Sequence, residues 1–320
     1  MSINDKILQQ QVQLQRVVNG LIKNDLLPGL KGNYREVRSL LLDAEQITNQ
    51  RQLNAITAKI SKLITDNSLK VWQGVTSELN NFAEYELTYL ANAMAASGYA
   101  VKGVTDSTNY IAKALMSLDG ANPVTGTWAD FVKANASGQA DVINNQIKAA
   151  FVNNESIRDT VKRIKSATEG VISNRVENLA RTGASHYSAM ARKAFAEDNS
   201  DIIEKEYPIV TFDSRLSVTC ASIGSKYSQK GWPVGKSPIG YPPYHYGCRT
   251  VIGFGLEGVD ESPSKDVNEW FSKQPPEFQD DVLGVTRAEA FRKGVPLDKF
   301  TDATQRVITV EELAKNYQQI

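Results

Sequence analysis

Three of the four cysteine and histidine residues in this 320-residue chain lie in one Gly- and Pro-rich segment. These residues are Cys220, His245 and Cys248, and the stretch IGYPPYHYGCRTVIGF holds two of them. A His-x2-Cys spacing lets both side chains face one ion, and Zn²⁺ prefers cysteine and histidine ligands in sets of four. Here the set stops at three, and Asp213, His186 or water would have to supply the fourth ligand.

The same residues could also serve a cysteine nucleophile. A thiolate beside a histidine, oriented by a third group such as Asp213, is the minimum for Cys-His catalysis. The sequence predicts neither Cys220 nor Cys248 at a helix N-terminus, where the pKa of a thiol is lowered. We therefore expect no enzyme and no catalytic residue.

The interpretation that we favour is structural. Both cysteines would be buried small apolar side chains, or a disulfide if oxidised. His245 would hydrogen-bond to a backbone carbonyl or to Asp213, while Arg215 and Arg249 would pair with carboxylates or backbone groups. A loop-rich segment needs such side-chain partners because its backbone lacks regular ones. We expect no cofactor, with zinc at Cys220, His245 and Cys248 as the alternative.

Composition excludes several classes of protein. Thirty-six basic and 36 acidic residues cancel, which gives no reason for strong attraction to nucleic acid or anionic membranes. The N-terminal stretch MSINDKILQQQVQLQRVV carries no secretory signal pattern, and two cysteines make no disulfide framework, so we expect folding in a reducing cytoplasm. The chain contains no Walker A, GxGxxG, HExxH or GxSxG motif.

Helical periodicity dominates the first half of the chain. Apolar residues recur at helical spacing within residues 11–27, and the stretch LLPGLKG is predicted to end that helix. Further helices are expected around residues 53–64, 72–82 and 142–151, and a long one over about 166–197. Within the long helix, Gly183 would permit close approach of another backbone.

The amino-acid composition changes near residue 200, and from there to Gly255 a Gly or Pro occurs every few residues. This part is predicted to be loop-dominated, with short strands at EYPIV and TVIGF. Short capped helices follow, among them one with a Thr309/Glu312 capping box. The expected fold is α+β and predominantly α. It comprises a helical region over residues 1–155, a core over 156–256 and a helical extension over 257–320.

An ordered series of motifs resembles the phage head-morphogenesis family, the Mu F-like minor capsid proteins. That family has a helix with Ala-Arg-Thr, a strand ending in Asp-x-Arg, a Cys or His, and a final Pro-x-His-x-x-Cys-Arg block. The corresponding residues here are Arg181, Thr182, Asp213, Arg215, Cys220, Pro243, His245, Cys248 and Arg249. The order and spacing match over about residues 155–255, and the C-terminal stretch is also similar to extensions found in the family.

Two positions depart from the family pattern. Many members have Glu where this chain has Gly183, and many end the last block with Cys-Arg-Cys, where this chain has Thr250. The second difference removes a candidate fourth thiolate.

The resemblance implies a minor head protein without catalytic activity, located inside the head near the portal after assembly in the host cytoplasm. Its expected partners are the portal protein and also the scaffold or major capsid protein and the packaged DNA, with no membrane. It would aid head assembly and genome packaging or delivery. The alternative is an internal virion protein ejected into the host, with DNA-binding or Cys/His effector activity.

Overall fold

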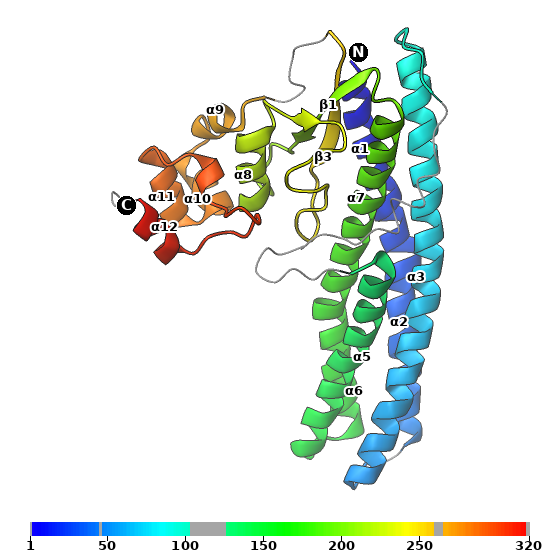
Figure 1. The fold of residues 1–320 in the computed structure, drawn as a ribbon. Coiled ribbons are helices and arrows are strands. Elements are labelled where there is room, and N and C mark those ends of the chain that lie inside the picture. The colour runs from blue at the N-terminus through cyan, green and yellow to red at the C-terminus, as the bar shows by residue number, and fades with distance from the viewer. Residues whose placement is uncertain (1, 45–46, 103–125, 259–264, 318–320) are drawn as a thin grey trace. The chain divides into compact units, whose positions relative to one another are not determined.

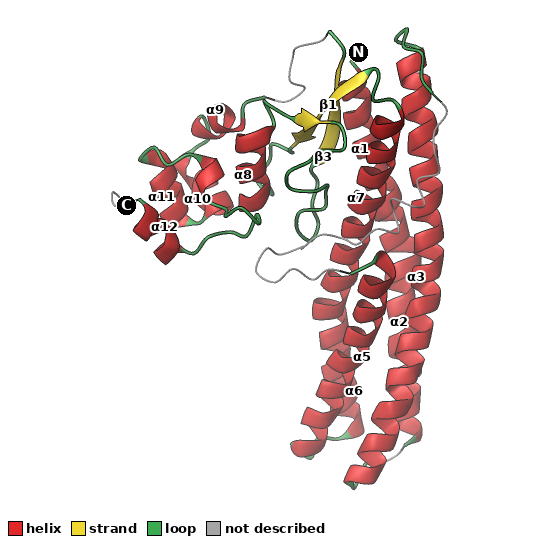
Figure 2. Cartoon of the chain, in the orientation of Figure 1, coloured by secondary structure: helices red, strands yellow, loops and turns green. Residues whose placement is uncertain are grey.

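The computed structural model describes residues 2–44, 47–102, 126–258 and 265–317. These residues are mostly helical, with one small antiparallel sheet (Figures 1 and 2), which confirms the predicted α+β, predominantly α class. No helix in these ranges is long and apolar enough to cross a membrane. Most of the loop predicted for residues 117–126 lies outside the described residues.

Long helices make up the first 198 residues. They are α1 (Ile3–Leu21), the π-helical turn η1 (Ile22–Leu26), α2 (Leu27–Asp43), α3 (Gln50–Ala95), α5 (Trp128–Val152), α6 (Ile157–Ala167), the π-helical turn η2 (Thr168–Ile172) and α7 (Ser173–Asp198).

Short strands and helices follow. They are β1 (Ile203–Ile209), α8 (Val218–Tyr227), β2 (Trp232–Pro233), β3 (Val251–Leu256), α9 (Val267–Ser272), α10 (Pro276–Leu283), α11 (Val285–Arg292), η3 (Leu297–Lys299) and α12 (Val310–Asn316).

The chain divides into two compact units, each assembled from separate stretches. Unit 1 comprises Met1–Gln13, Phe82–Thr125 and Ala184–Ile320, and unit 2 comprises Leu14–Asn81 and Gly126–Gly183. Helices α1, α3 and α7 contribute residues to both. The sequence analysis divided the chain into the consecutive ranges 1–155, 156–256 and 257–320. The division into compact units does not test those ranges, which stay a prediction.

The helix that begins near the N-terminus does not end at Pro28, contrary to the sequence prediction. The chain stays helical through η1, and Pro28 falls in the first turn of α2. The π turn just before Pro28, in which the Leu27 N–H donates to the Ile22 carbonyl, interrupts the regular α-helical hydrogen bonding where proline lacks an N–H. Two more predicted helices, over residues 53–64 and 72–82, are parts of the single helix α3.

Aromatic packing explains why a glycine, Gly183, lies within α7. The rings of Trp72 and Trp128 meet edge to face, with centroids 5.9 Å apart. A Cβ atom at Gly183 would lie 2.3 Å from the Trp128 ring, so no larger residue fits there while the indole keeps this position. The close approach predicted at Gly183 therefore exists, but a side chain makes it rather than a backbone.

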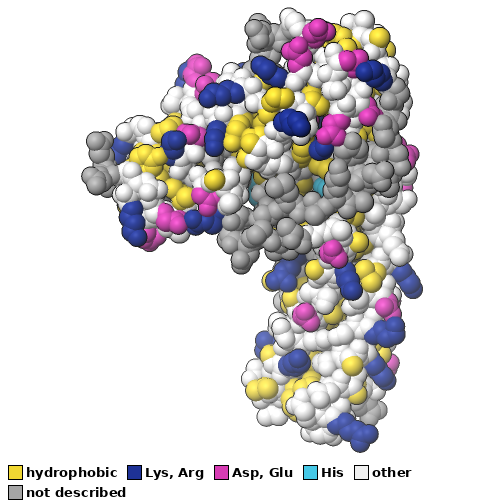
Figure 3. Space-filling view, in the orientation of Figure 1, with side chains coloured by type: hydrophobic (Ala, Val, Ile, Leu, Met, Phe, Trp, Pro, Cys, Tyr) yellow, Lys and Arg dark blue, Asp and Glu magenta, His cyan; other side chains and the backbone are white. Residues whose placement is uncertain are grey.

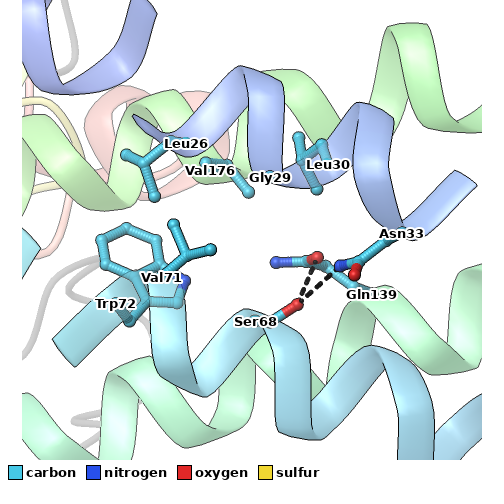
Figure 4. Close-up of a pocket in the computed structure, with 9 residues that line it drawn as sticks. All are labelled: Leu26, Gly29, Leu30, Asn33, Ser68, Val71, Trp72, Gln139 and Val176. Atoms are coloured by element: carbon cyan, nitrogen blue, oxygen red, sulfur yellow. Dashed lines mark hydrogen bonds between the residues drawn. The ribbon is translucent and has the colours of Figure 1, made fainter. Parts of the chain in front are cut away.

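A polar network crosses the core of unit 2 (Figure 4). The Asn33 side-chain amide donates to Ser68 Oγ at 3.1 Å, and Ser68 Oγ donates to Gln139 Oε1 at 3.0 Å. All three residues are buried, and a cavity of about 10 Å³ beside them is also lined by Gly29 and Trp72. Because buried polar groups are costly unless paired, this network favours one alignment of α2, α3 and α5.

Replacing Ser68 with Ala should destabilise the protein. The change leaves the Asn33 amide and the Gln139 oxygen buried without this partner, which costs about 1–3 kcal/mol. Urea unfolding of the full chain measures the loss, and Ser77→Ala, at an exposed position of the same helix, should stay within about 0.5 kcal/mol of wild type. Equal stabilities for the two variants would show that the network does not stabilise the fold.

The sheet of unit 1 has the strand order β2-β1-β3, with both pairings antiparallel. Every residue of β3 is buried, which confirms the strand predicted at TVIGF. The Asn4 side chain of α1 donates to the Phe254 carbonyl and accepts from the Phe254 N–H, both at 2.8 Å. A side-chain amide thus takes the place of a further strand at the edge of β3, and edge strands need such protection.

A buried ion pair connects α3 and α7 within unit 1. Arg192 Nε donates to Glu86 Oε1 at 2.6 Å, and the two side chains are only 1% and 0% exposed. Removing one partner of such a pair leaves an uncompensated buried charge. The pair therefore restricts both helices to positions in which the charges meet.

Candidate metal centre

Cys220, His245 and Cys248 converge in unit 1. Cys220 Sγ lies 3.0 Å from His245 Nε2 and 3.8 Å from Cys248 Sγ, and the three ligand atoms all lie within 4.8 Å of one another. Both cysteines are free and buried. The structure therefore brings together the three residues that the sequence singled out for metal or nucleophilic chemistry.

Cys220 lies in the first turn of α8, a helix that the sequence analysis missed. Ser217 caps this helix, and its Oγ accepts a hydrogen bond from the Cys220 N–H at 3.1 Å. The prediction that neither cysteine lies at a helix N-terminus was therefore wrong. One available signal was the absence of proline between Ser217 and Tyr227. Gly224, which suggested a loop, lies where a Cβ would be 2.7 Å from a Val267 methyl carbon.

A tight turn before β3 supplies the other two residues. The Cys248 N–H donates to the His245 carbonyl at 3.2 Å, and Gly247 has a φ of 69°. Positive φ at the third position of a four-residue turn favours glycine, since other residues are strained there. The turn therefore fixes the separation of the His245 and Cys248 backbones.

Hydrogen bonds orient the His245 ring. Its Nδ1 lies 2.9 Å from the Tyr246 carbonyl oxygen, which can only accept, so Nδ1 carries the proton of this bond. In the neutral ring Nε2 is then the acceptor, and it faces Ser217 Oγ at 2.9 Å and the Cys220 sulfur. Burial opposes protonation of this ring, but the Cys248 sulfur and the Tyr246 carbonyl outweigh it and raise the pKa of His245.

The two thiols titrate as a pair. The hydrogen bond with Cys248, together with burial, raises the pKa of the Cys220 thiol well above its usual value. Burial opposes ionisation of Cys248 too, but hydrogen bonds with Cys220 and His245 outweigh it and lower the pKa of the Cys248 thiol. These opposite shifts favour a thiolate at Cys248 beside a neutral Cys220 thiol, whose sulfur lies 3.8 Å away.

This arrangement is better suited to holding an ion than to attacking a substrate. The distance between Cys220 Sγ and His245 Nε2 fits a Cys-His dyad, yet the two cysteines are only 4% and 1% exposed. The adjoining cavity is about 10 Å³, which is room for one water molecule. It is lined by Thr211, Arg215, Leu216, Ser217, Cys220, His245, Arg249 and Thr250.

An ion pair next to the cluster connects the segment after β1 to the segment before β3. Both terminal nitrogens of Arg249 donate to the Asp213 carboxylate, at 2.5 and 2.6 Å, and these hydrogen bonds lower the pKa of that carboxyl. Arg215 is 77% exposed and its guanidinium lies 3.7 Å from Asp213. The pairing expected for Arg249 is therefore confirmed, and that of Arg215 is weak.

The remaining motif residues lie outside the Cys-His-Cys cluster and have structural roles. Pro243 is buried and follows Pro242 through a cis peptide bond. Arg181 and Thr182 belong to unit 2, where Arg181 donates to Gln15 at 3.4 Å. The Thr182 hydroxyl donates to the Asn178 carbonyl one turn earlier in α7, at 2.7 Å.

Glu206 on β1 is a buried carboxylate that sequence reasoning did not single out. Its Oε2 accepts from Trp232 Nε1 at 3.1 Å, from the Gly235 N–H at 3.1 Å and from the Tyr241 hydroxyl at 2.6 Å. Burial raises its pKa, although these three donors and the Lys193 charge oppose the shift. No local sequence pattern marks this residue, because its donors lie 26 to 35 positions away.

Comparisons with protein-family models, with curated proteins and with solved structures found no match for this chain. The resemblance to the head-morphogenesis family therefore depends on the motif residues described above.

Replacing Arg249 with Lys should destabilise unit 1. A lysine ammonium cannot donate two parallel hydrogen bonds to Asp213, so we expect a loss of about 1–2 kcal/mol in the free energy of unfolding. Arg215→Lys is the matched control, and its stability should stay within about 0.5 kcal/mol of wild type. Chemical denaturation of the reduced protein measures both, and equal losses would contradict a special role for Arg249.

Replacing Glu206 with Gln should change how stability depends on pH. The folded-state pKa of Glu206 is raised above 4.5, so its stabilising contribution is complete below that pH and is lost as pH rises through the folded pKa. Glutamine can still accept from all three donors and does not ionise. The variant should gain stability relative to wild type as pH rises, by up to about 1.4 kcal/mol per pH unit.

Urea unfolding between roughly pH 5 and 8 measures this difference, over the range in which maximal stability tends to lie. Glu204→Gln, at an exposed position of the same strand, should show no such trend. A constant difference between Glu206→Gln and wild type across the range would contradict the assignment.

Proposed function

We propose that this protein is a bacteriophage minor head protein that associates with the portal inside the head and aids head assembly and genome packaging or delivery. The observation that carries the proposal is the convergence of separated motif residues. Asp213 pairs with Arg249, and Cys220 meets His245 and Cys248, although these residues are 25 to 36 positions apart. The contacts among these five motif residues support the resemblance, since a chance string of matches has no reason to meet in space.

The long helices offer surface for protein partners. Helix α3 has 46 residues, which corresponds to about 69 Å at 1.5 Å per residue. It carries the exposed Tyr85, whose ring lies 6.3 Å from that of Tyr89. Aromatic residues are enriched at protein interfaces. The expected partners are the portal protein first, and then the scaffold or major capsid protein.

Charge supports a protein partner more than general DNA binding. Basic and acidic side chains are both scattered over the face drawn in Figure 3. Affinity for DNA comes largely from neutralising phosphates, which a chain of zero net charge does weakly unless basic residues gather locally. Contact with the packaged DNA end is therefore a secondary part of the proposal.

An ejected effector that uses a Cys-His dyad is the second candidate. The 3.0 Å contact between Cys220 and His245 favours it, whereas the burial of both thiols opposes it. Slow reaction of both thiols with a small disulfide reagent in the folded protein would count against this candidate.

Fractionation of phage particles tests the proposal. Procapsids, mature heads and tails from the phage that encodes this chain would be separated and analysed by quantitative mass spectrometry. We expect the protein in procapsids and heads in far fewer copies than the major capsid protein, and co-purification with the portal after mild disruption. Its absence from both procapsids and virions would overturn the proposal, and a presence confined to tails would do the same.

A further inference from the structure

The distance between the two buried sulfurs matches a metal site rather than a covalent bond. Two thiolates each about 2.3 Å from a tetrahedral zinc ion lie about 3.8 Å apart. Cys220 Sγ and Cys248 Sγ are 3.8 Å apart, whereas a disulfide needs about 2.05 Å. The sulfurs therefore already lie at the separation of two zinc ligands, which is also the distance of the hydrogen bond between the two thiols.

We propose that Cys220, His245 and Cys248 bind one Zn²⁺ ion whose fourth ligand is a water molecule in the adjoining cavity. This inference departs from the purely structural interpretation favoured by the sequence. It is independent of the proposed function, because a stabilising ion suits a head protein, an effector or any other role.

The ring of His245 is oriented as a zinc ligand should be. Zinc-binding histidines usually donate their other ring N–H to a carbonyl or carboxylate, which fixes the ring and leaves a lone pair for the metal. The bond between Nδ1 and the Tyr246 carbonyl at 2.9 Å does this, and it leaves Nε2 facing the sulfurs. Nitrogen and sulfur ligands of tetrahedral zinc lie about 3.6 Å apart, so Nε2 and Cys220 Sγ, now at 3.0 Å, would separate by about half an ångström.

The fourth ligand position falls to water. Asp213, one of the residues suggested by the sequence, is occupied by its two hydrogen bonds with Arg249. Among the described residues only three cysteine, histidine or acidic side chains form this group. The cavity of about 10 Å³ has room for one water molecule, and the hydroxyls of Ser217 and Thr250 border it.

Thr250 marks the place where a fourth protein ligand could be introduced. Its Oγ1 donates to Cys220 Sγ at 3.1 Å, so a thiol at this position would lie next to the other ligands. Because a fourth thiolate completes the tetrahedral set, Thr250→Cys should tighten zinc binding. Thr250→Val, which keeps the shape of the side chain and removes the hydroxyl, is the matched control.

Metal analysis of the full-length protein, purified under reducing conditions with added zinc and then dialysed, tests the proposal. We expect one zinc per chain, a lower melting temperature after chelation, and cobalt substitution with thiolate-to-metal charge-transfer absorption. Cys220→Ser and Cys248→Ser should each weaken zinc binding by at least about tenfold, and Thr250→Cys should strengthen it by a similar factor. Thr250→Val loses the hydrogen bond to Cys220 Sγ and adds no ligand, so it should not strengthen zinc binding.

Several results would overturn the proposal. One is a folded, reduced wild-type protein that takes up neither zinc nor cobalt. Another is uptake that persists unchanged in a folded Cys248→Ser variant, because zinc would then be bound elsewhere. A third is a mass lower by two hydrogen atoms under those reducing conditions, since it would show that the sulfurs form a disulfide instead. Circular dichroism of each variant separates loss of the ligand from loss of the fold.

Discussion

The pairing of β1 with β3 is the constraint on which the cluster in unit 1 depends. The last register pair is Ile209 with Val251, and the chain on both sides continues toward the cluster. Beyond that pair, the Thr211 hydroxyl donates to the Arg249 carbonyl at 3.4 Å, and Asp213 binds the Arg249 side chain. Two segments far apart in sequence thereby converge, which brings the α8 cysteine to the turn before β3. A shift of register by one residue would reverse the faces of every side chain in the pairing.

Buried polar groups set the alignment of elements elsewhere in the protein. Glu206 accepts hydrogen bonds from Trp232 of β2 and from two residues in the segment after β2, and Glu86 pairs with Arg192 between α3 and α7. In unit 2, Ser68 joins partners on two other helices. Apolar side chains tolerate small shifts, whereas each of these groups loses its partner when an element moves. The polar contacts therefore favour one arrangement of helices and strands that apolar packing alone would leave less defined.

The number of protein ligands in the Cys-His-Cys group argues against a zinc site, whereas the distances between them argue for one. By count, three ligands fall short of a zinc site with four protein ligands. By distance, two sulfurs at 3.8 Å and an oriented imidazole provide three-quarters of a tetrahedral site, with a water-sized cavity beside it. A protein whose family resemblance implies assembly rather than catalysis can still use such an ion to hold a loop-rich module together.

Local structure was determined largely by the sequence itself. Thr309 caps its helix as predicted, because a capping box acts within one helical turn. Ser156 at the start of α6, and Pro276 and Gly284 at the two ends of α10, act over the same short range. Only the tertiary structure decided that Cys220 of α8 meets His245, that Arg249 rather than Arg215 holds Asp213, and that Glu206 is buried. These outcomes depend on contacts between residues 25 to 36 positions apart, whose geometry no local pattern encodes.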